Sequence, residues 1–390
     1  MTYQTPPTIA MVAGETSGDL LGALLIGGLQ QRWPALTAVG IGGENMAARG
    51  FQAWWPSRKL AVRGYVEVLR HYREILGIRK QLAARLLAAP VGQRANLFVG
   101  VDAPDFNLDL EAQLKKRGIK TVHFICPSIW AWRPERVKKI KYSTDHVLCI
   151  FPFEVALLAQ HGIGATFVGH PLANVIPMHP DRSAARRTLG FADTDTVIAI
   201  LPGSRQSEVK YLAFRFFQAV ALVLNASPAI KVVVPAISGL RHHIEAAALA
   251  AGVTRQIKVL DGQSHVALAA CDVTLIASGT ATLEAALFKR PMVIAYNMHW
   301  LSWRIMRAKQ LQPWVGLPNI LCGDFVVPEL LQNAATPQAL ADGLLRWLDA
   351  KTAAPSTITA LESRFTQLHH DLQRDTFQLA CDAIEKILQG

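Results

Sequence analysis

Three short glycine-containing segments could each bind an anionic or sugar ligand. Residues 13–19 (Ala-Gly-Glu-Thr-Ser-Gly-Asp), 202–205 (Pro-Gly-Ser-Arg) and 277–280 (Ala-Ser-Gly-Thr) each follow an apolar run and precede a helical pattern. A turn between a strand and a helix exposes backbone N–H groups at the positive end of the helix dipole. The glycines of the first segment do not have the G-x-G-x-x-G spacing of a dinucleotide site. The sequence therefore predicts ligand sites in both halves of the chain. The residues expected at the first of them are Gly14, Glu15, Ser17 and Gly18.

The segment around Gly203 has the residue types of a phosphate site. Gly203 lets the backbone approach a ligand, and Ser204 can donate a hydrogen bond to a phosphate. Arg205 supplies a fixed charge and a planar fork of donors. An ordinary helix cap, with Glu208 near the first turn, would explain the same residues and contributes about 1 kcal/mol. These residues alone leave both interpretations open.

The third segment combines a phosphate-type turn with a carboxylate. Ser278, Gly279 and Thr280 can present N–H groups to a diphosphate. Glu284 follows one helical turn later on the side of the loop, where a carboxylate suits the hydroxyl groups of a ribose. A lone glutamate at such a position is normally a solvated helix residue, but its pairing with this turn favours the ribose interpretation.

A third kind of chemistry is indicated by Asp102, which ends an apolar strand-like run. Catalytic carboxylates collect at such strand ends in α/β folds. The alternative is that Asp102 and Asp105 only shape the turn and cap the next helix. We assign Asp102 to catalysis, as a general base, and Asp105 to a helix cap.

Residues 128–133 (Ser-Ile-Trp-Ala-Trp-Arg) combine aromatic side chains with a following basic run. The cations of that run are Arg136, Lys138, Lys139 and Lys141. Such a combination could stack on nucleic-acid bases, lie at a membrane interface or hold phosphate. A packed loop followed by a solvated basic helix would also explain it.

Residues 62–78 form a helical pattern whose apolar side chains cover about half the circumference. This face consists of Val62, Tyr65, Val66, Val68, Leu69, Tyr72, Ile75 and Leu76. Arginine and lysine residues surround it, which is typical of a helix lying in a membrane interface. A buried core helix would show a similar apolar face, so both interpretations stay open. Residues 300–314 repeat the aromatic and basic character.

Composition limits the class of protein. The 390 residues carry a formal charge of +11, which favours an anionic partner. The chain is 51% hydrophobic, yet we expect neither a membrane span nor a signal peptide. The five scattered cysteines show no disulfide framework, which fits a reducing cytoplasm. Neither they nor the twelve histidines have metal-ligand spacing, so we expect no metal and no cofactor.

Short β-branched runs alternate with helical patterns in both halves of the chain, which predicts parallel sheets covered by helices. Three prolines between residues 171 and 180 mark a crossing between domains. The predicted fold class is therefore α/β, with two doubly wound Rossmann-like domains and a cleft between them. The expected divisions are 1–175, 176–350 and a set of C-terminal helices in 351–390.

Seven motifs, in order, resemble the lipid-A-disaccharide synthase family of bacterial two-domain glycosyltransferases of the GT-B type. They are Ala13-Gly14-Glu15-x-Ser17-Gly18-Asp19, Gly40-x-Gly42-Gly43-x-x-Met46, Val101-Asp102-Ala103-Pro104-Asp105-Phe106-Asn107, Ser128-x-Trp130-Ala131-Trp132-Arg133, Leu201-Pro202-Gly203-Ser204-Arg205, Ser278-Gly279-Thr280-Ala281-Thr282-Leu283-Glu284 and Leu317-Pro318-Asn319. Asn174 departs from the acidic residue common in the family, at the crossing between domains.

The resemblance implies that UDP-2,3-diacylglucosamine is the donor and 2,3-diacylglucosamine 1-phosphate (lipid X) the acceptor. The products would be a β-1,6-linked lipid A disaccharide 1-phosphate and UDP, in lipopolysaccharide biosynthesis of a Gram-negative bacterium. The first domain would hold the acceptor and face the membrane, and the second would bind the UDP-sugar. The implied catalytic residues are Asp102 and Arg205, and Asn319 joins the substrate-binding residues.

The implied location is cytoplasmic, with peripheral attachment to the anionic inner-membrane surface, without nucleic acid as a partner and with a homodimer left open. An RNA-binding protein would use the charge and the 130–141 segment, but this alternative leaves the carboxylates and the glycine turns unexplained. A closer alternative is a GT-B transferase that adds N-acetylglucosamine to a peptidoglycan lipid precursor.

Overall fold

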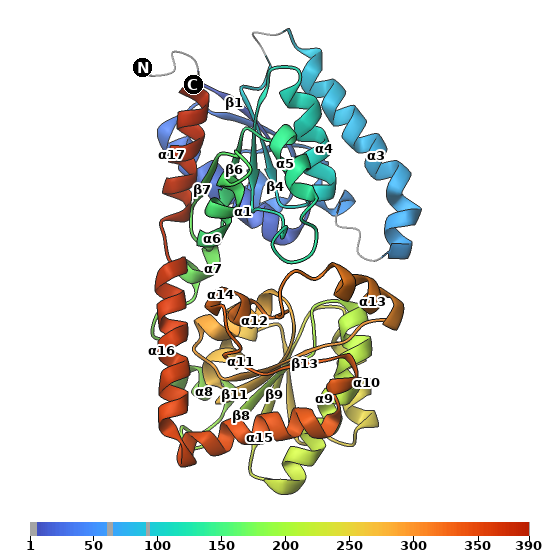
Figure 1. The fold of residues 1–390 in the computed structure, drawn as a ribbon, viewed down its shortest axis with the longest axis vertical. Coiled ribbons are helices and arrows are strands. Elements are labelled where there is room, and N and C mark those ends of the chain that lie inside the picture. Colours follow the sequence, from blue (N-terminus) through green and yellow to red (C-terminus); the bar gives the residue numbers. More distant parts are fainter. Residues whose placement is uncertain (1–5, 61–64, 91–93, 390) are drawn as a thin grey trace. The chain divides into compact units, whose positions relative to one another are not determined.

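The computed structural model describes residues 6–60, 65–90 and 94–389, apart from the side chains of Thr16 and of residues 65–72. The chain divides into two compact units (Figure 1). The first comprises residues 1–171 and 372–390, and the second comprises residues 172–371. Each unit is a parallel sheet with helices on both sides, as the alternation of strand and helix patterns predicts.

The first unit contains seven parallel strands in the order β3-β2-β1-β4-β5-β6-β7. The strands are β1 Thr8–Ala13, β2 Thr37–Gly42, β3 Gln52–Pro56, β4 Leu97–Val101, β5 Lys120–Phe124, β6 His146–Cys149 and β7 Ala165–Phe167. The helices are α1 Thr16–Arg32, α2 Glu44–Ala47, α3 Tyr65–Ala88, α4 Pro104–Lys115, α5 Arg136–Ser143, α6 Pro152–Ala159 and α17 Thr376–Gln389, with a short 3-10 turn, η1, at Ser57–Lys59. Helix α7 (Pro171–Val175) begins at the boundary between the units.

Apolar burial explains this arrangement. Strands β1 and β4 are buried along nearly their whole length, because helices cover both faces of the sheet. On one side, α3 and α4 pack their apolar faces on the strands, with Leu82 and Leu110 both fully buried there. On the other side, α1 and α17 pack against each other (Figure 1).

The second unit contains six parallel strands in the order β10-β9-β8-β11-β12-β13. The strands are β8 Val197–Leu201, β9 Lys231–Ala236, β10 Ile257–Asp261, β11 Val273–Ala277, β12 Met292–Tyr296 and β13 Glu329–Leu331. The helices are α8 Arg182–Leu189, α9 Gln206–Ala226, α10 Arg241–Ala250, α11 Ser264–Ala270, α12 Thr280–Leu287, α13 Trp300–Lys309, α14 Leu317–Cys322, α15 Pro337–Ala353 and α16 Pro355–Leu372, with a 3-10 turn, η3, at Gln332–Ala334.

Helix α9 supplies much of the core of the second unit, together with α10 and α15. Its length and apolar composition would allow it to cross a membrane, and within the described residues it alone meets that test. Its apolar side chains are instead used inside the protein, since Phe216 and Phe217 are fully buried against the sheet.

Eleven strand-like runs are expected from the sequence, and all are confirmed within one or two residues. They cover residues 9–13, 36–41, 97–102, 121–126, 147–151, 166–168, 197–201, 231–234, 257–260, 273–277 and 293–296. Strands β3 and β13 were missed. Both missed strands lie at sheet edges, and neither contains a fully buried residue. An edge strand has only one neighbour and needs less apolar sequence. Another result not foreseen is that α17 belongs to the first unit, beside α1.

The helix predicted over residues 62–78 is part of α3. Val62 lies outside the described residues, as do the side chains of Tyr65, Val66, Val68, Leu69 and Tyr72. Of the remaining two, Ile75 and Leu76 are half-buried, and Ile75 packs against the core of the first unit. The C-terminal half of α3 is therefore a core helix.

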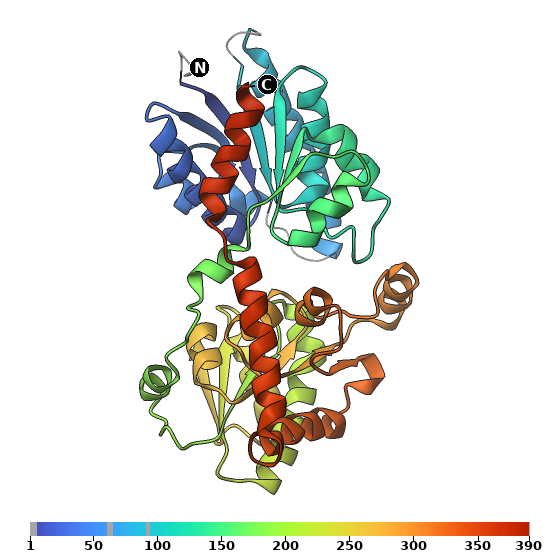
Figure 2. The same ribbon diagram turned by 60° about the vertical axis from the view of Figure 1, so that its left-hand side comes forward.

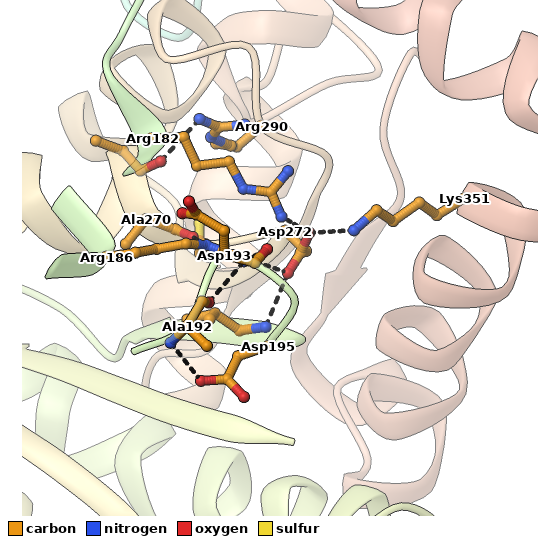
Figure 3. Close-up of polar contacts among 12 residues, drawn as sticks. Arg182, Arg186, Ala192, Asp193, Asp195, Ala270, Asp272, Arg290 and Lys351 are labelled. Carbon is orange, nitrogen blue, oxygen red and sulfur yellow. Dashed lines mark hydrogen bonds and ion pairs between the residues drawn. The ribbon is translucent and has the colours of Figure 1, made fainter. Parts of the chain in front are cut away.

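A buried ion-pair network holds the amino ends of the central strands in the second unit (Figure 3). Asp272, just before β11, pairs with Arg182, with Arg186 at 2.9 Å and with Lys351 at 2.7 Å. It also accepts the backbone N–H of Val197, the first residue of β8. Arg186 has no exposed area and donates to the carbonyl oxygens of three residues besides. The network thus joins α8, β8, β11 and α15.

Removing the Asp272 charge should destabilise the second unit. Burial alone would raise the pKa of Asp272, but Lys351, the Val197 N–H and Arg182 lower it below its usual value. Asp272→Asn leaves Arg186 buried without its counter-ion, which costs about 3–5 kcal/mol. Because the folded-state pKa is depressed, the contribution is present at neutral pH and is lost as the pH falls through that pKa.

Urea unfolding at pH 7 and at about pH 3 would measure this effect. The matched control is Asp349→Asn, which alters an exposed aspartate on α15. A pH 7 midpoint equal to that of the wild type would show that the network contributes no net stability.

Candidate functional site

The turns that follow β1 and β4 in the first unit lie side by side. Strand β1 pairs with β4, and Ala13 at the end of one lies opposite Val101 at the end of the other. A Cβ atom built on Gly14 would lie 3.4 Å from the Cβ of Ala103, so the turns after both strands are in contact. Strands β2 and β3 lie on one side of β1, and strands β4 to β7 lie on the other, so the strand order reverses between β1 and β4. Open α/β sheets bind ligands at such a switch point. Glu15 and Ser17 are exposed there, whereas Gly14 and Gly18 are buried.

Asp19, which ends the first motif, has a structural task. Its buried carboxylate accepts hydrogen bonds from the backbone N–H groups of Gly43, Asn45 and Met46 at 2.6, 2.9 and 3.2 Å. These are donors at the start of α2, so Asp19 caps that helix from a neighbouring element. A side chain on Gly43 would meet the carboxylate, with a Cβ only 2.7 Å from Oδ2.

Asp102 has an unusual backbone. Its φ is +50°, and the φ of Ala103 is +44°, so two consecutive residues with side chains are left-handed. Such conformations cost free energy and persist where the surroundings impose them. Here the Asp102 N–H donates to the Phe124 carbonyl at 2.9 Å, and the Asn107 amide donates to the Asp102 carbonyl at 2.8 Å. The turn is thus held from β5 and from α4.

The Asp102 carboxyl group is accessible to solvent but closely surrounded by protein atoms. This desolvation raises its pKa, with a smaller contribution from the charge of Glu15. His123 and the Ala103 N–H act in the opposite direction. The predicted catalytic residue and the predicted substrate-binding Glu15 are therefore electrostatic neighbours.

A buried pair behind Asp102 was missed by the sequence analysis. Nδ1 of His123 on β5 lies 2.7 Å from Oε1 of Glu111 on α4, and neither side chain has exposed area. Burial alone would lower the pKa of His123, but Glu111 and then Asp102 raise it above its usual value. Nε2 of His123 has no hydrogen-bond partner within the described residues. Neither residue belongs to one of the sequence motifs, so only the tertiary structure identifies the pair.

Asp105 does not cap a helix, so that expectation is wrong. The N-cap residue of α4 is Ala103, and Asp105 lies in the first turn, exposed and paired with Arg136. Part of the basic run is used in the same way, since Lys139 pairs with Asp109.

The aromatic segment before that run is partly a packed loop. Trp130 is buried, and its indole N–H donates to Glu154 at 3.0 Å. Burial raises the pKa of Glu154 to about 7. Trp132 is exposed, with the Arg133 guanidinium 4.2 Å from its ring centroid.

The second unit repeats the arrangement of adjacent strand ends. Strand β8 pairs with β11, and Leu201 lies opposite Ile276, again at the switch point of the sheet. Segments 202–205 and 278–280 are therefore neighbours at the carboxyl ends of these strands. The structure brings together the predicted donor-site residues of both segments.

The turn after β8 is shaped by Glu208. Its carboxylate accepts the N–H groups of Ser204 and Arg205 at 2.8 and 3.2 Å, and the Arg205 side chain lies 3.2 Å away. Gly203 has a φ of +133°, and a Cβ there would lie 2.4 Å from that of Glu208. Glu208 thus bonds the N–H groups at the start of α9, as the helix-cap interpretation expects. Arg205, with 66% of its side chain exposed, remains available to an anion.

In the turn after β11, some hydrogen-bond donors are bonded within the protein and others lie at the surface. The Ser278 N–H donates to the Ala295 carbonyl, and the Ser278 hydroxyl donates to the Val315 carbonyl. Gly279 and Thr280 are exposed at the start of α12. Glu284 is partly buried one turn later, 3.3 Å from Nε2 of His265.

Asn319 is buried and fully bonded within its own loop. Its amide nitrogen donates to the Val327 carbonyl and to Glu329, and its oxygen accepts the N–H groups of Val326 and Val327. Glu329 also accepts the N–H groups of Val315 and Gly316. Asn319 therefore fixes the shape of the 315–329 loop, which also receives the Ser278 hydroxyl. Within the described residues, no group of three metal-ligating side chains comes together.

Comparisons with known proteins identify the family. A family model described as lipid-A-disaccharide synthetase matches residues 9–384. A lipid-A-disaccharide synthase of Albidiferax ferrireducens is 69% identical over 383 residues, covering 98% of this chain and 97% of that protein. A relative of the same name from Burkholderia thailandensis is 50% identical, covering 100% of this chain and 99% of that protein.

Solved structures show the fold. A UDP-GlcNAc 2-epimerase from Neisseria meningitidis, bound to UDP-GlcNAc, has a TM-score of 0.63 at 9% identity, covering 99% of this chain and all of that one. The Acinetobacter baumannii MurG has a TM-score of 0.56 at 14% identity, covering 98% of this chain and all of that one. The predicted GT-B class is confirmed.

The match over nearly the whole chain favours one of the three functions considered from the sequence. It decides against an RNA-binding protein and against a transferase of peptidoglycan precursors. The seven-motif resemblance is thereby confirmed. The chain belongs to the lipid-A-disaccharide synthase family, glycosyltransferases of lipid A biosynthesis.

Proposed function

We propose that the chain transfers diacylglucosamine from UDP-2,3-diacylglucosamine to the 6-hydroxyl of 2,3-diacylglucosamine 1-phosphate, with inversion at the donor C1. The acceptor hydroxyl loses its proton as its oxygen bonds to C1, and the bond from C1 to the UDP oxygen breaks. UDP leaves with the electron pair of that bond. The observation that supports the proposal is the pair of switch points, one with the exposed Asp102 carboxyl group and one with the exposed Arg205 guanidinium.

Asp102 is the proposed base. It follows β4 in a turn that β5 and α4 hold in a left-handed conformation, so its position is imposed by the fold. Desolvation raises the pKa of Asp102, which makes its carboxylate a stronger base toward a hydroxyl, and His123 limits the increase. Glu15, Ser17, Gly14 and Gly18 form the adjacent turn and would contact the acceptor.

The second unit would bind UDP at the turns after β8 and β11. Negative charge develops on the diphosphate as the glycosidic bond breaks, and fixed donors stabilise it. The exposed Arg205 guanidinium, the Ser204 hydroxyl and the start of α12 at Gly279 and Thr280 are suited to that task. Ser278 and Asn319 support this site by fixing the turn and the 315–329 loop.

Both proposed substrates are acylated, so the enzyme must reach a membrane surface. We propose that it is a cytoplasmic protein attached peripherally to the anionic inner membrane. The net charge of +11 supports electrostatic attraction to such a surface. The apolar residues at the start of α3 are the contact proposed in the first unit.

Asp102→Asn should leave the fold intact and lower kcat by about 10²–10⁴-fold, the range for loss of a general base. Asp105→Asn, an exposed neighbour in the same segment, is the control and should retain activity. In the wild type, activity should fall as the pH drops through the pKa of Asp102. That fall should lie above the usual range of an aspartate, because desolvation raises this pKa. A near wild-type kcat in Asp102→Asn would place the base elsewhere.

Arg205→Ala should reduce kcat by a factor that corresponds to about 2–4 kcal/mol of transition-state stabilisation. Arg205→Lys should recover part of the loss, because it restores charge but not the planar fork. Arg255→Ala removes another exposed arginine of the same unit and controls for net charge. If Arg205→Ala raises only KM, the guanidinium binds the donor equally in ground and transition states.

Glu284 should accept hydrogen bonds from the ribose of UDP. Titration calorimetry should show weaker UDP binding for Glu284→Ala and a smaller loss for Glu284→Gln. The variant His265→Ala removes the ion-pair partner of Glu284 and leaves the Glu284 carboxylate in place. It therefore separates the effect of ribose binding from the effect of losing the ion pair. Equal UDP affinity in the wild type and both Glu284 variants would remove this residue from the site.

A further inference from the structure

Helix α13 of the second unit has no buried residue, although half of its ten residues are large and apolar. Its Trp300, Leu301 and Ile305 are 61%, 50% and 55% exposed, and Leu311 just after it is 52% exposed. Figure 2 shows α13 standing off the rest of this unit, and it packs extensively on no other described helix or strand. A soluble protein rarely exposes so much apolar side chain in one short segment unless the surface has a partner.

The apolar side chains lie on the outward face of the helix. Successive helical residues are about 100° apart, so the half-buried Trp303 and Met306 mark the side that faces the protein. Leu301 and Ile305 lie on the opposite side, where Ala308 is also exposed. The usual amphipathic pattern of a surface helix is therefore inverted.

All charged residues of this helix and of the sequence next to it are cationic. Arg304, Arg307 and Lys309 are exposed on the helix itself. No aspartate or glutamate occurs between Glu284 and Asp324 in the sequence. An apolar face with tryptophan and basic residues is complementary to the interface of a bilayer that contains anionic lipids. A site for RNA would instead place the cations and aromatic faces outward without the aliphatic side chains.

We propose that α13 and Leu311 form a membrane-docking surface that inserts Trp300, Leu301 and Ile305 at the headgroup boundary of an anionic bilayer. Arg304, Arg307 and Lys309 then lie at the level of the lipid phosphates. This assignment rests on the proposed membrane attachment and adds a contact in the unit that binds the nucleotide. Docking through the second unit would let the acyl chains of the donor stay in or near the bilayer while its UDP occupies the protein.

The first test is vesicle sedimentation of the full chain with Trp300→Ser, Leu301→Ser and Ile305→Ser combined. Vesicles of phosphatidylglycerol and phosphatidylethanolamine present the anionic surface, and phosphatidylcholine vesicles present a neutral one. We expect at least a tenfold loss of binding to the anionic vesicles, with UDP affinity and circular dichroism unchanged. The matched control combines Ile237→Ser and Leu249→Ser, which are exposed apolar residues elsewhere in the second unit and should have no effect.

A charge variant, Arg304→Gln, Arg307→Gln and Lys309→Gln, should remove the preference for anionic over neutral vesicles. Unchanged binding in the α13 serine variant overturns the proposal. If that variant loses self-association instead, by sedimentation equilibrium, the face contacts a second copy of the chain, which also overturns it.

A further variant separates this inference from the proposed attachment through α3. Val66→Ser, Val68→Ser, Leu69→Ser and Leu76→Ser alter the first unit only. If they abolish binding while the α13 variant binds normally, the membrane attachment stands and the role of α13 is overturned. A wild type that binds no vesicle would contradict both proposals.

The second measurement does not depend on serine substitutions. Brominated lipids quench the fluorescence of tryptophans that reach the acyl region. Part of the quenching seen with the wild type should disappear in Trp300→Phe, a conservative change on an exposed position. Equal fractional quenching in both proteins would show that Trp300 does not enter the bilayer.

Discussion

Both units depend on parallel strands whose backbone hydrogen bonds are made entirely within a buried sheet. Strands β1, β4, β8 and β11 have helices on both faces, so nearly all their residues are apolar and buried. Such strands can carry no exposed reactive group along their length. Chemistry is therefore confined to the turns that leave their carboxyl ends, and the strand order determines which turns become neighbours. The pairing of β1 with β4 and of β8 with β11 selects the four turns that the proposed mechanism uses.

Polar residues in these turns fall into two groups that sequence motifs do not separate. The side-chain oxygens of Asp19, Asn319 and Glu208 accept hydrogen bonds from backbone N–H groups of nearby turns and loops. Asp102 and Arg205 are held in place but keep accessible side chains. A motif can therefore contain one residue that shapes a turn and another whose side chain stays available to a ligand. Their hydrogen-bond partners distinguish the two.

The sequence was sufficient to predict the central strands and the two-unit α/β architecture, because continuous burial leaves a continuous apolar signal. It was insufficient for β3 and β13, since edge strands are short and partly exposed. It predicted that Asp102 follows a buried strand, because an apolar run directly precedes this residue in the sequence. It could not identify Glu111 and His123, because their 2.7 Å contact joins a helix to a strand without any spacing rule. For the same reason it did not foresee that α17 packs in the first unit.

That placement of α17 has a consequence for synthesis of the chain. Residues 172–371 lie between the main part of the first unit and the helix that completes it. Helix α17 buries Cys381 and Ile384, and Asp382 and Glu385 pair with Arg32 of α1. At about 5–20 residues per second, a ribosome needs roughly 10–40 s to translate the intervening segment. During that interval the nascent first unit presents the uncovered apolar side of α1. The second unit is continuous in sequence and can fold before the first is complete.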